Sequence, residues 1–280
     1  IDSNMKSLKI TLMCLFVSTI VCANVSQTEK EALIALYNTT QGEQWNTTWN
    51  VNTPIESWYG VTVEDNHVVE LNLQMNNLQG TLPQEIGGLT HLRKINLGFN
   101  KLSGDLPLSF FNLKELNTLQ LFMNGFDGNI PSEIGQLTNL EVLELFSNSF
   151  RGEIPKSIGN LVNLKSLVLG SNFLSGQIPR EISQLAQLKK LSLMDNKLEG
   201  SIPAELGNLK HLEELVLSSN ALTGNIPYEL NYLSELSTIM VSGNNLNQDI
   251  ASISILNKDE ESLKVKLQFN TATSVAGDED

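Results

Sequence analysis

The sequence predicts a solenoid of stacked short repeats, and three observations support this fold class. A frame of 24 residues fits from Val68 onward without insertion and restarts at 92, 116, 140, 164, 188, 212 and 236. Apolar residues fill positions one, four and six of each unit, as Leu92, Ile95 and Leu97 do in the second. One unit alone cannot bury these side chains, so neighbouring units must stack to cover them.

The third observation is a set of columns in which one polar or turn-forming residue recurs. Position thirteen is glycine in seven units, which suits a tight bend with positive φ, and proline follows three residues later. Position nine is asparagine in every unit, and a buried Asn side chain can satisfy backbone groups where the chain leaves a strand. We therefore expect a structural ladder of Asn76, Asn100, Asn124, Asn148, Asn172, Asn196, Asn220 and Asn244.

Seven units, among them LEVLELFSNSFRGEIPKSIGNLVN, agree at nearly every position with LxxLxLxxNxLxGxIPxxIGxLxx, and an eighth, from 236, is degenerate. This pattern resembles the plant-type leucine-rich repeat (LRR), over about 190 of the 280 residues. The resemblance implies an α/β solenoid, a right-handed superhelix with a concave parallel β-sheet. Short strands and 3-10 turns would form its convex side. It also implies similarity to secreted LRR receptor ectodomains and to LRR inhibitors of enzymes.

The first 23 residues have the composition of a secretory signal peptide. Lys6 and Lys9 precede an uncharged apolar run over 10–23, which is shorter than the roughly 18 residues needed to span a bilayer. We expect cleavage after Ala23, with residues 1–4 as a short upstream remnant and without a transmembrane anchor. Lipid attachment at Cys22 is the alternative, although Val21 is bulkier than the residue expected before a lipidated cysteine.

Residues 24–67 are predicted to form an N-terminal cap. Ser26 or Thr28 can cap a helix that fits Thr28 to Tyr37, because an acidic residue follows three positions later. Trp45, Trp49 and Trp58 come next, in a run similar to the cap of plant-type repeat proteins, although the cysteines that brace that cap are absent here. We expect the tryptophans to plug the open end of the core, and a sugar-stacking platform is the alternative.

The solenoid is predicted to cover residues 68–247 and to end in two further segments. Apolar and polar residues alternate from Leu263 to Phe269, so we expect a C-terminal cap over 248–270. Residues 271–280 end in GDED and are typical of an acidic, disordered tail.

The net charge disfavours some classes of partner, and the cysteine content disfavours disulfide and zinc-binding scaffolds. Eighteen Lys and Arg against 31 Asp and Glu give a net charge of −13, which disfavours nucleic acid and anionic membranes as partners. The two cysteines, Cys14 and Cys22, lie inside the predicted signal peptide, so neither a disulfide scaffold nor a cysteine zinc framework is expected. We expect no metal site and no cofactor.

Outward-facing positions are where a binding function can lie. Opposite charges recur at positions two and three of neighbouring units, such as Lys190 beside Glu214, and are expected to pair across strands. At positions seven and eight, five apolar side chains gather in the first four units, and the repeat frame turns all of them to solvent. We expect these to form a partner-binding site on the concave face, unless a loop of the cap covers them. They are Met75, Phe99, Phe122, Met123 and Phe146.

Catalysis finds no support in the sequence. No GxSxG, HExxH, P-loop or GxGxxG motif occurs, and His67, His91 and His211 fall at turn positions where we expect simple solvation. Carboxylate pairs such as Glu213 with Glu214 would lie on an open face, with no cleft to perturb a pKa. We therefore expect a protein without enzymatic activity.

The sequence therefore predicts a secreted or cell-surface LRR binding module that recognises a protein or peptide on its concave face. A secreted glycosidase is one partner of that kind, because the enzyme-inhibitor resemblance implies it. The alternative is a carbohydrate-binding protein, or a passive structural or adhesive surface protein.

Overall fold

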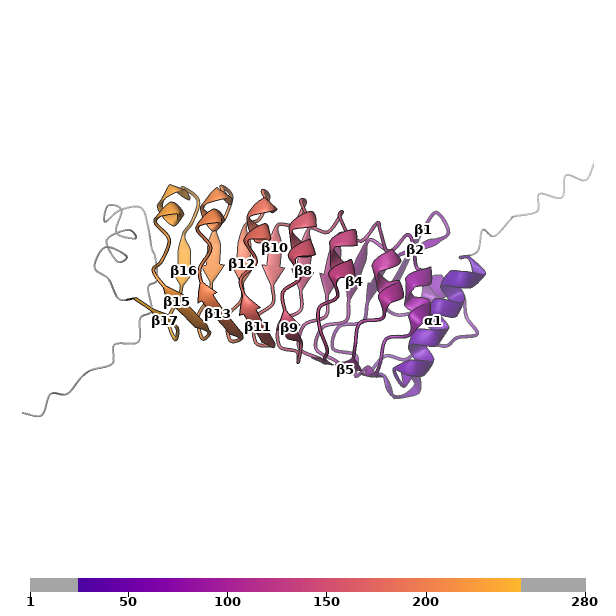
Figure 1. The fold of residues 1–280 in the computed structure, drawn as a ribbon. Helices are drawn as coiled ribbons and strands as arrows, with labels where there is room; N and C mark the ends of the chain where they lie inside the picture. Colours follow the sequence, from indigo (N-terminus) through magenta and orange to yellow (C-terminus); the bar gives the residue numbers. More distant parts are fainter. Residues whose placement is uncertain (1–24, 248–280) are drawn as a thin grey trace, which may run out of the picture.

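The computed structural model describes residues 25–247, and Figure 1 shows them as one row of coils stacked side by side, closed at the N-terminal end by α1 (Gln27–Thr39). Each repeat that is described in full contains a strand of a long sheet, a strand or extended segment at the following bend, and one short 3-10 turn. The LRR solenoid is therefore confirmed. The expectations for residues 1–23, 248–270 and 271–280 lie outside the described residues.

The long sheet lines the concave face, and its strands follow one another in repeat order. From β2 onward all neighbours are parallel, with each residue paired to the one 24 positions later, as Ile95 is to Leu119. The strands are, in spatial order, β1 (Val61–Glu64), β2 (His67–Asn72), β4 (Lys94–Asn96), β6 (Thr118–Gln120), β8 (Val142–Glu144), β10 (Ser166–Val168), β12 (Lys190–Ser192), β14 (Glu214–Val216) and β16 (Thr238–Met240).

The remaining strands form two smaller parallel sheets. One contains β3 (Gln79–Gly80), β5 (Lys101–Gly104) and β7 (Gly125–Phe126), and the other contains β9 (Arg151–Glu153), β11 (Phe173–Gln177), β13 (Lys197–Ser201), β15 (Ala221–Gly224) and β17 (Asn245–Leu246). The 3-10 turns are η1 (Gly42–Gln44), η2 (Ile55–Ser57), η3 (Gln84–Gly88), η4 (Leu108–Asn112), η5 (Ser132–Gln136), η6 (Lys156–Asn160), η7 (Arg180–Gln184), η8 (Ala204–Asn208) and η9 (Tyr228–Tyr232).

The apolar repeat positions form one continuous core. Leu92, Ile95 and Leu97 are fully buried, and so are Phe126 and Phe150 at position eleven, whose rings stack at 6.3 Å between centroids. The core runs from the cap helix to the last described repeat, because each coil covers the apolar face of the one before it. Among residues 25–247, the one α-helix has neither the length nor the apolar character that crossing a bilayer requires.

The ladder asparagines link each coil to its neighbours. Asn148 is typical: its Oδ1 accepts the Phe126 N–H at 3.1 Å, and its Nδ2 donates to the carbonyls of Leu121 and Leu145 at 3.0 Å. One side chain therefore satisfies backbone groups in two successive coils. The same arrangement recurs in the next coil, where Asn172 accepts from the Phe150 N–H.

The cap closes the core with a helix and three indole rings. Ser26 and Glu29 form a capping box at the start of α1, and the buried Glu29 also accepts the Val68 N–H at 3.0 Å. Trp45, Trp49 and Trp58 are at most 5% exposed, so the plug interpretation is confirmed and the sugar-stacking platform is wrong. Their indole faces are covered by one another and are not available to a ligand.

The edge of the long sheet differs from the expectation of a purely parallel sheet. β1 pairs antiparallel with β2 through a two-residue turn, in which Asp65 and Asn66 both adopt positive φ (48° and 67°). That geometry fits a type I′ hairpin, which Asp and Asn tolerate. β1 thereby covers the backbone groups that β2 would otherwise leave unpaired at the edge.

Candidate binding surface

The five apolar residues at positions seven and eight form a continuous group at the ends of the first concave strands, which we call the aromatic strip. Met75, Phe99 and Met123 are exposed by 64%, 43% and 40%, whereas Phe146 is half-buried. The neighbouring rings touch: Phe99 meets Phe122 edge to face with 5.4 Å between ring centroids, and Phe122 stacks on Phe146 with 4.8 Å between centroids. The sequence-predicted residues are therefore brought together by the fold.

Phe122 corrects the expectation that all five side chains face solvent. Its ring is only 7% exposed, because it lies between the two neighbouring aromatic rings and over Gly98. Gly98 occupies position seven of the preceding unit, where a Cβ would come within 2.6 Å of the Phe122 Cζ. Phe122 is therefore the packed base of the aromatic strip, and the exposed surface belongs to its neighbours.

Gly98→Ala should destabilise the protein, because the new methyl group would occupy the space of the Phe122 ring. We expect a loss of about 1–3 kcal/mol in the free energy of unfolding, the usual cost of overpacking. The double variant Gly98→Ala/Phe122→Ala should lose less than the sum of the two single variants, because the clash is then relieved. Urea unfolding followed by circular dichroism measures all three, and strict additivity would show that the two side chains do not meet.

The backbone under the exposed strip residues has an unusual conformation for bulky side chains. Met75, Phe99 and Met123, all at position eight, have φ of 56°, 54° and 51°. Position eight keeps this left-handed geometry in the later repeats, where it carries small or polar residues: Ser147, Ser171, Asp195, Ser219 and Gly243. Bulky residues with positive φ are rare and cost stability, and such strain concentrates at functional sites.

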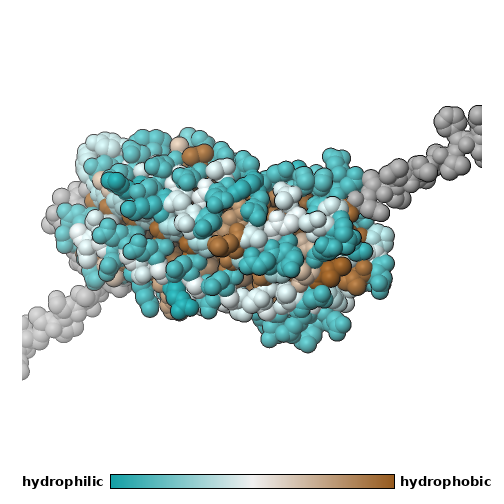
Figure 2. Space-filling view, turned by 45° about the vertical axis from the view of Figure 1, so that its right-hand side comes forward, coloured by the Kyte–Doolittle hydropathy of each residue, from teal (hydrophilic) through white to brown (hydrophobic). Residues whose placement is uncertain are grey.

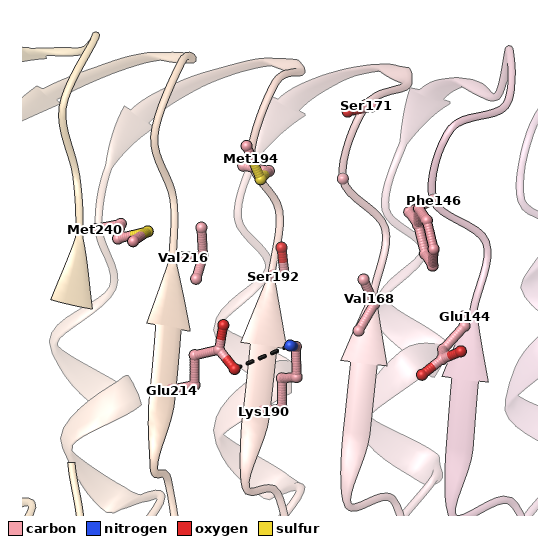
Figure 3. A pocket seen from close by; sticks show the side chains of 11 residues that line it. Glu144, Phe146, Val168, Ser171, Lys190, Ser192, Met194, Glu214, Val216 and Met240 are labelled. Carbon is pink, nitrogen blue, oxygen red and sulfur yellow. Dashed lines mark ion pairs between the residues drawn. The ribbon is translucent and has the colours of Figure 1, made fainter. Parts of the chain in front are cut away.

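An apolar hollow continues the aromatic strip across the later repeats. Figure 3 shows Phe146, Val168, Met194, Val216 and Met240 around this hollow, in or just after successive strands of the long sheet. The hollow has a volume of about 330 Å³. Lys190 and Glu214 line it at the strand starts, and Glu144 lines it at the end of β8, level with Val168. The sequence prediction did not include Met194 and Met240. Met194 holds position seven, as Phe122 and Phe146 do, so the repeat frame carried a usable signal for it, whereas Met240 holds position five, in line with Val168 and Val216.

The charged columns pair across neighbouring strands as expected. Lys165 reaches Glu141 at 2.7 Å, Lys189 reaches Glu213 at 2.8 Å, and Lys190 reaches Glu214 at 2.9 Å (the dashed line in Figure 3). The hydrogen bond and the negative charge of Glu213 raise the pKa of Lys189 above its usual value, so this lysine stays protonated. Glu213 and Glu214, the carboxylates considered for acid–base chemistry, are thus each held by a lysine.

The cap does not cover the strip, which settles the alternative raised by the sequence. Asn46, in the loop after η1, donates to the Met75 carbonyl at 2.9 Å, so the loop reaches the strip's backbone. It nonetheless leaves the Met75 side chain more exposed than any other residue of the strip. On the face of the molecule drawn in Figure 2, hydrophilic side chains dominate and hydrophobic ones form small, separate spots.

Comparisons with known proteins agree with this fold. Two family models described as leucine rich repeat match residues 138–198 in one case and residues 67–89, 91–113 and 211–233 in the other. No curated protein sequence matches the chain.

Among solved structures, the ectodomain of the Arabidopsis thaliana receptor kinase GASSHO1/SCHENGEN3, in complex with CASPARIAN STRIP INTEGRITY FACTOR 2, is 33% identical with a TM-score of 0.74. The Arabidopsis receptor kinase HAESA, in complex with the peptide hormone IDA and the co-receptor SERK1, is 28% identical with a TM-score of 0.76. These alignments cover 86% and 87% of this chain but only 28% and 42% of the receptor chains.

A plant ice-binding protein is 25% identical with a TM-score of 0.76, and its alignment covers 88% of this chain and 81% of that one. The matches to the repeat models, the parallel coils and the similarity to plant receptor ectodomains all point to one family. The chain belongs to the leucine-rich-repeat proteins, and its repeats are of the plant type.

Proposed function

We propose that this protein is a non-catalytic binding module that captures an extended peptide segment along its concave face. The observation that carries the proposal is the occurrence of Met75, Phe99 and Met123 at a left-handed backbone position that is small or polar in the other repeats. These residues reduce stability where they stand, and packing does not require them, since each is at least 40% exposed. A role in contacting a partner accounts for both properties.

The dimensions of the apolar surface favour a peptide over a small ligand. Seven strand-to-strand steps of about 4.8 Å separate Met75 from Met240, which makes roughly 34 Å, or about ten extended residues. The exposed side chains of Met75, Phe99 and Met123 lie at one end of this surface, and the hollow between Phe146 and Met240 follows them. We expect a ligand with several apolar side chains, because the nearby lysines already have acidic partners.

The relatives support a binding role of this kind. A plant peptide hormone receptor, RGFR1 in complex with RGF2, is 38% identical over 62% of this chain, and HAESA is described with a peptide hormone. We also propose that the protein acts outside the cytoplasm, either secreted or at the cell surface.

Other ligands fit the structure less well. Recognition of a glycan is the weaker candidate, because the three cap tryptophans are buried. A folded partner such as a secreted glycosidase would have to present an apolar segment to the strip.

A peptide selection tests the proposal. Random dodecapeptides displayed on phage are selected on the wild-type protein, and the affinity of enriched peptides is measured by isothermal titration calorimetry. The test variant is Met75→Ser/Phe99→Ser/Met123→Ser, which introduces the residue that position eight carries in three later repeats, so the fold should be preserved. The control variant is Leu108→Ser/Val162→Ser/Phe173→Ser, which removes three exposed apolar side chains elsewhere.

We expect saturable binding of apolar peptides that weakens by at least about 100-fold in the test variant, because each buried apolar side chain contributes about 1.5–3 kcal/mol. The control variant should bind within about two-fold of wild type, the level expected when no contact is lost. Peptides that bind the test variant as well as wild type, or no enrichment at all, would refute the proposal.

A further inference from the structure

Three potential metal ligands meet where the cap joins the first repeat. Glu29 lies in the first turn of α1, His67 begins β2, and His91 occupies the equivalent position one repeat later. One donor atom from each lies within 4.8 Å of the others. The two imidazole rings stack at 3.6 Å between centroids, with an angle of 25° between their planes. The site lies apart from the proposed peptide surface and does not depend on it.

His67 carries an unsatisfied polar atom at the centre of this cluster. Its Nδ1 is buried and has no hydrogen-bond partner, although the Glu29 Oε2 lies 3.5 Å away. A buried ring nitrogen without a partner is costly, and native structures usually provide one. The expectation that His67 is simply solvated is therefore wrong.

Glu29 is held rigidly beside the imidazoles. The side chain is 3% exposed. Its Oε1 accepts the Val68 N–H at 3.0 Å, and its Oε2 accepts the Ser26 hydroxyl at 2.8 Å and the Ser26 N–H at 3.3 Å. Hydrogen bonds of this kind orient a ligating carboxylate and are typical of the shell around a metal ion. In the other ring, His91 Nδ1 lies 3.4 Å from the Thr90 hydroxyl.

We propose that Glu29, His67 and His91 bind one divalent transition-metal ion, with Zn²⁺ as the ion that fits best. Two imidazole nitrogens and one carboxylate oxygen are a ligand set that zinc accepts, with solvent completing the tetrahedron. Calcium and magnesium are disfavoured because both prefer oxygen ligands. Zinc bonds of about 2.0–2.1 Å require the donor atoms to approach to roughly 3.3 Å, and the half-exposed histidines have room for that adjustment.

A bound ion would join three segments that are distant in sequence: the cap helix, the β1–β2 hairpin and the first repeat. Because the native state alone assembles these ligands, binding would be linked to stability, and zinc should raise the melting temperature.

Zinc titration of the full chain without a histidine tag tests the site. Cys14→Ser and Cys22→Ser are present in every sample, so that thiolates do not compete for the metal. Calorimetric titration with zinc sulfate at pH 7.5 is run on this background and on His67→Gln, His91→Gln and His211→Gln. The last is the matched control: His211 holds the same repeat position, but its Nδ1 faces one exposed carboxylate, Glu235, at 3.2 Å.

We expect one Zn²⁺ per chain in the background protein and in His211→Gln, with a higher melting temperature in zinc. His67→Gln and His91→Gln should each bind at least about ten-fold more weakly, and zinc at the same concentration should raise their melting temperatures by less. Circular dichroism without metal confirms that each variant is folded. The absence of stoichiometric zinc binding, equal affinity in all four proteins, or loss in only one of the two cluster variants would overturn the site.

Discussion

Asn148→Ala is expected to lower the free energy of unfolding by about 3–5 kcal/mol, although it removes only an amide group. The Phe126 N–H and the carbonyls of Leu121 and Leu145 would lose their partner inside the solenoid. Each buried backbone group left unsatisfied costs about 1–3 kcal/mol. Water cannot readily replace the amide, because Asn148 is only 8% exposed.

Asn163→Ala is the matched control for this prediction. Asn163 is also in the fourth repeat, but it is exposed and donates one hydrogen bond, to the Thr138 carbonyl at 2.9 Å. Its loss should cost less than about 1 kcal/mol, because water can take over that contact. Urea unfolding followed by circular dichroism compares the two variants. Similar losses for both would mean that the ladder does not hold the coils together.

Trp49→Ala should destabilise the cap by about 3–5 kcal/mol, the usual cost of removing a large buried aromatic side chain. The Trp49 ring stacks on Trp58 at 4.8 Å, meets Trp45 edge to face at 4.8 Å, and donates through Nε1 to the Tyr59 carbonyl at 2.8 Å. Its loss would open the apolar end of the first coil to water. The melting temperature should fall accordingly in a thermal scan.

Two further variants separate packing from the hydrogen bond. Trp49→Phe keeps most of the ring contacts and loses the N–H, so it should cost clearly less than Trp49→Ala. Tyr59→Ala removes a ring that is 47% exposed in the same cap and should cost little. If Trp49→Ala were no more destabilising than Tyr59→Ala, the tryptophans would not be the plug of the core.

The period of the sequence predicts most of the fold. Because stacked coils place equivalent residues side by side, one frame places the core and the asparagine ladder in every described repeat. The cap obeys no such period, so the β1–β2 hairpin was not predicted. The signal was present in Asp65 and Asn66, two residues suited to a turn with positive φ.

The candidate sites were predictable only in part. The frame brings the strip residues together, but the burial of Phe122 depends on glycine at position 98, a contact across coils that hydrophobic spacing does not reveal. The zinc ligands His67 and His91 share one repeat position, which was a usable signal. Their third partner, Glu29, could not be found in this way, because it lies in a helix whose docking is set by tertiary packing.

The most direct test of the peptide-binding account is a titration of ¹³C-methyl-labelled methionine resonances with a selected peptide. Met75, Met123, Met194 and Met240 all lie on the concave face, whereas Met5 and Met13 precede the described residues. The account predicts that the four concave methyl signals shift with one common dissociation constant while the signals of Met5 and Met13 stay unchanged. Saturable binding that leaves the four concave signals unmoved would contradict it.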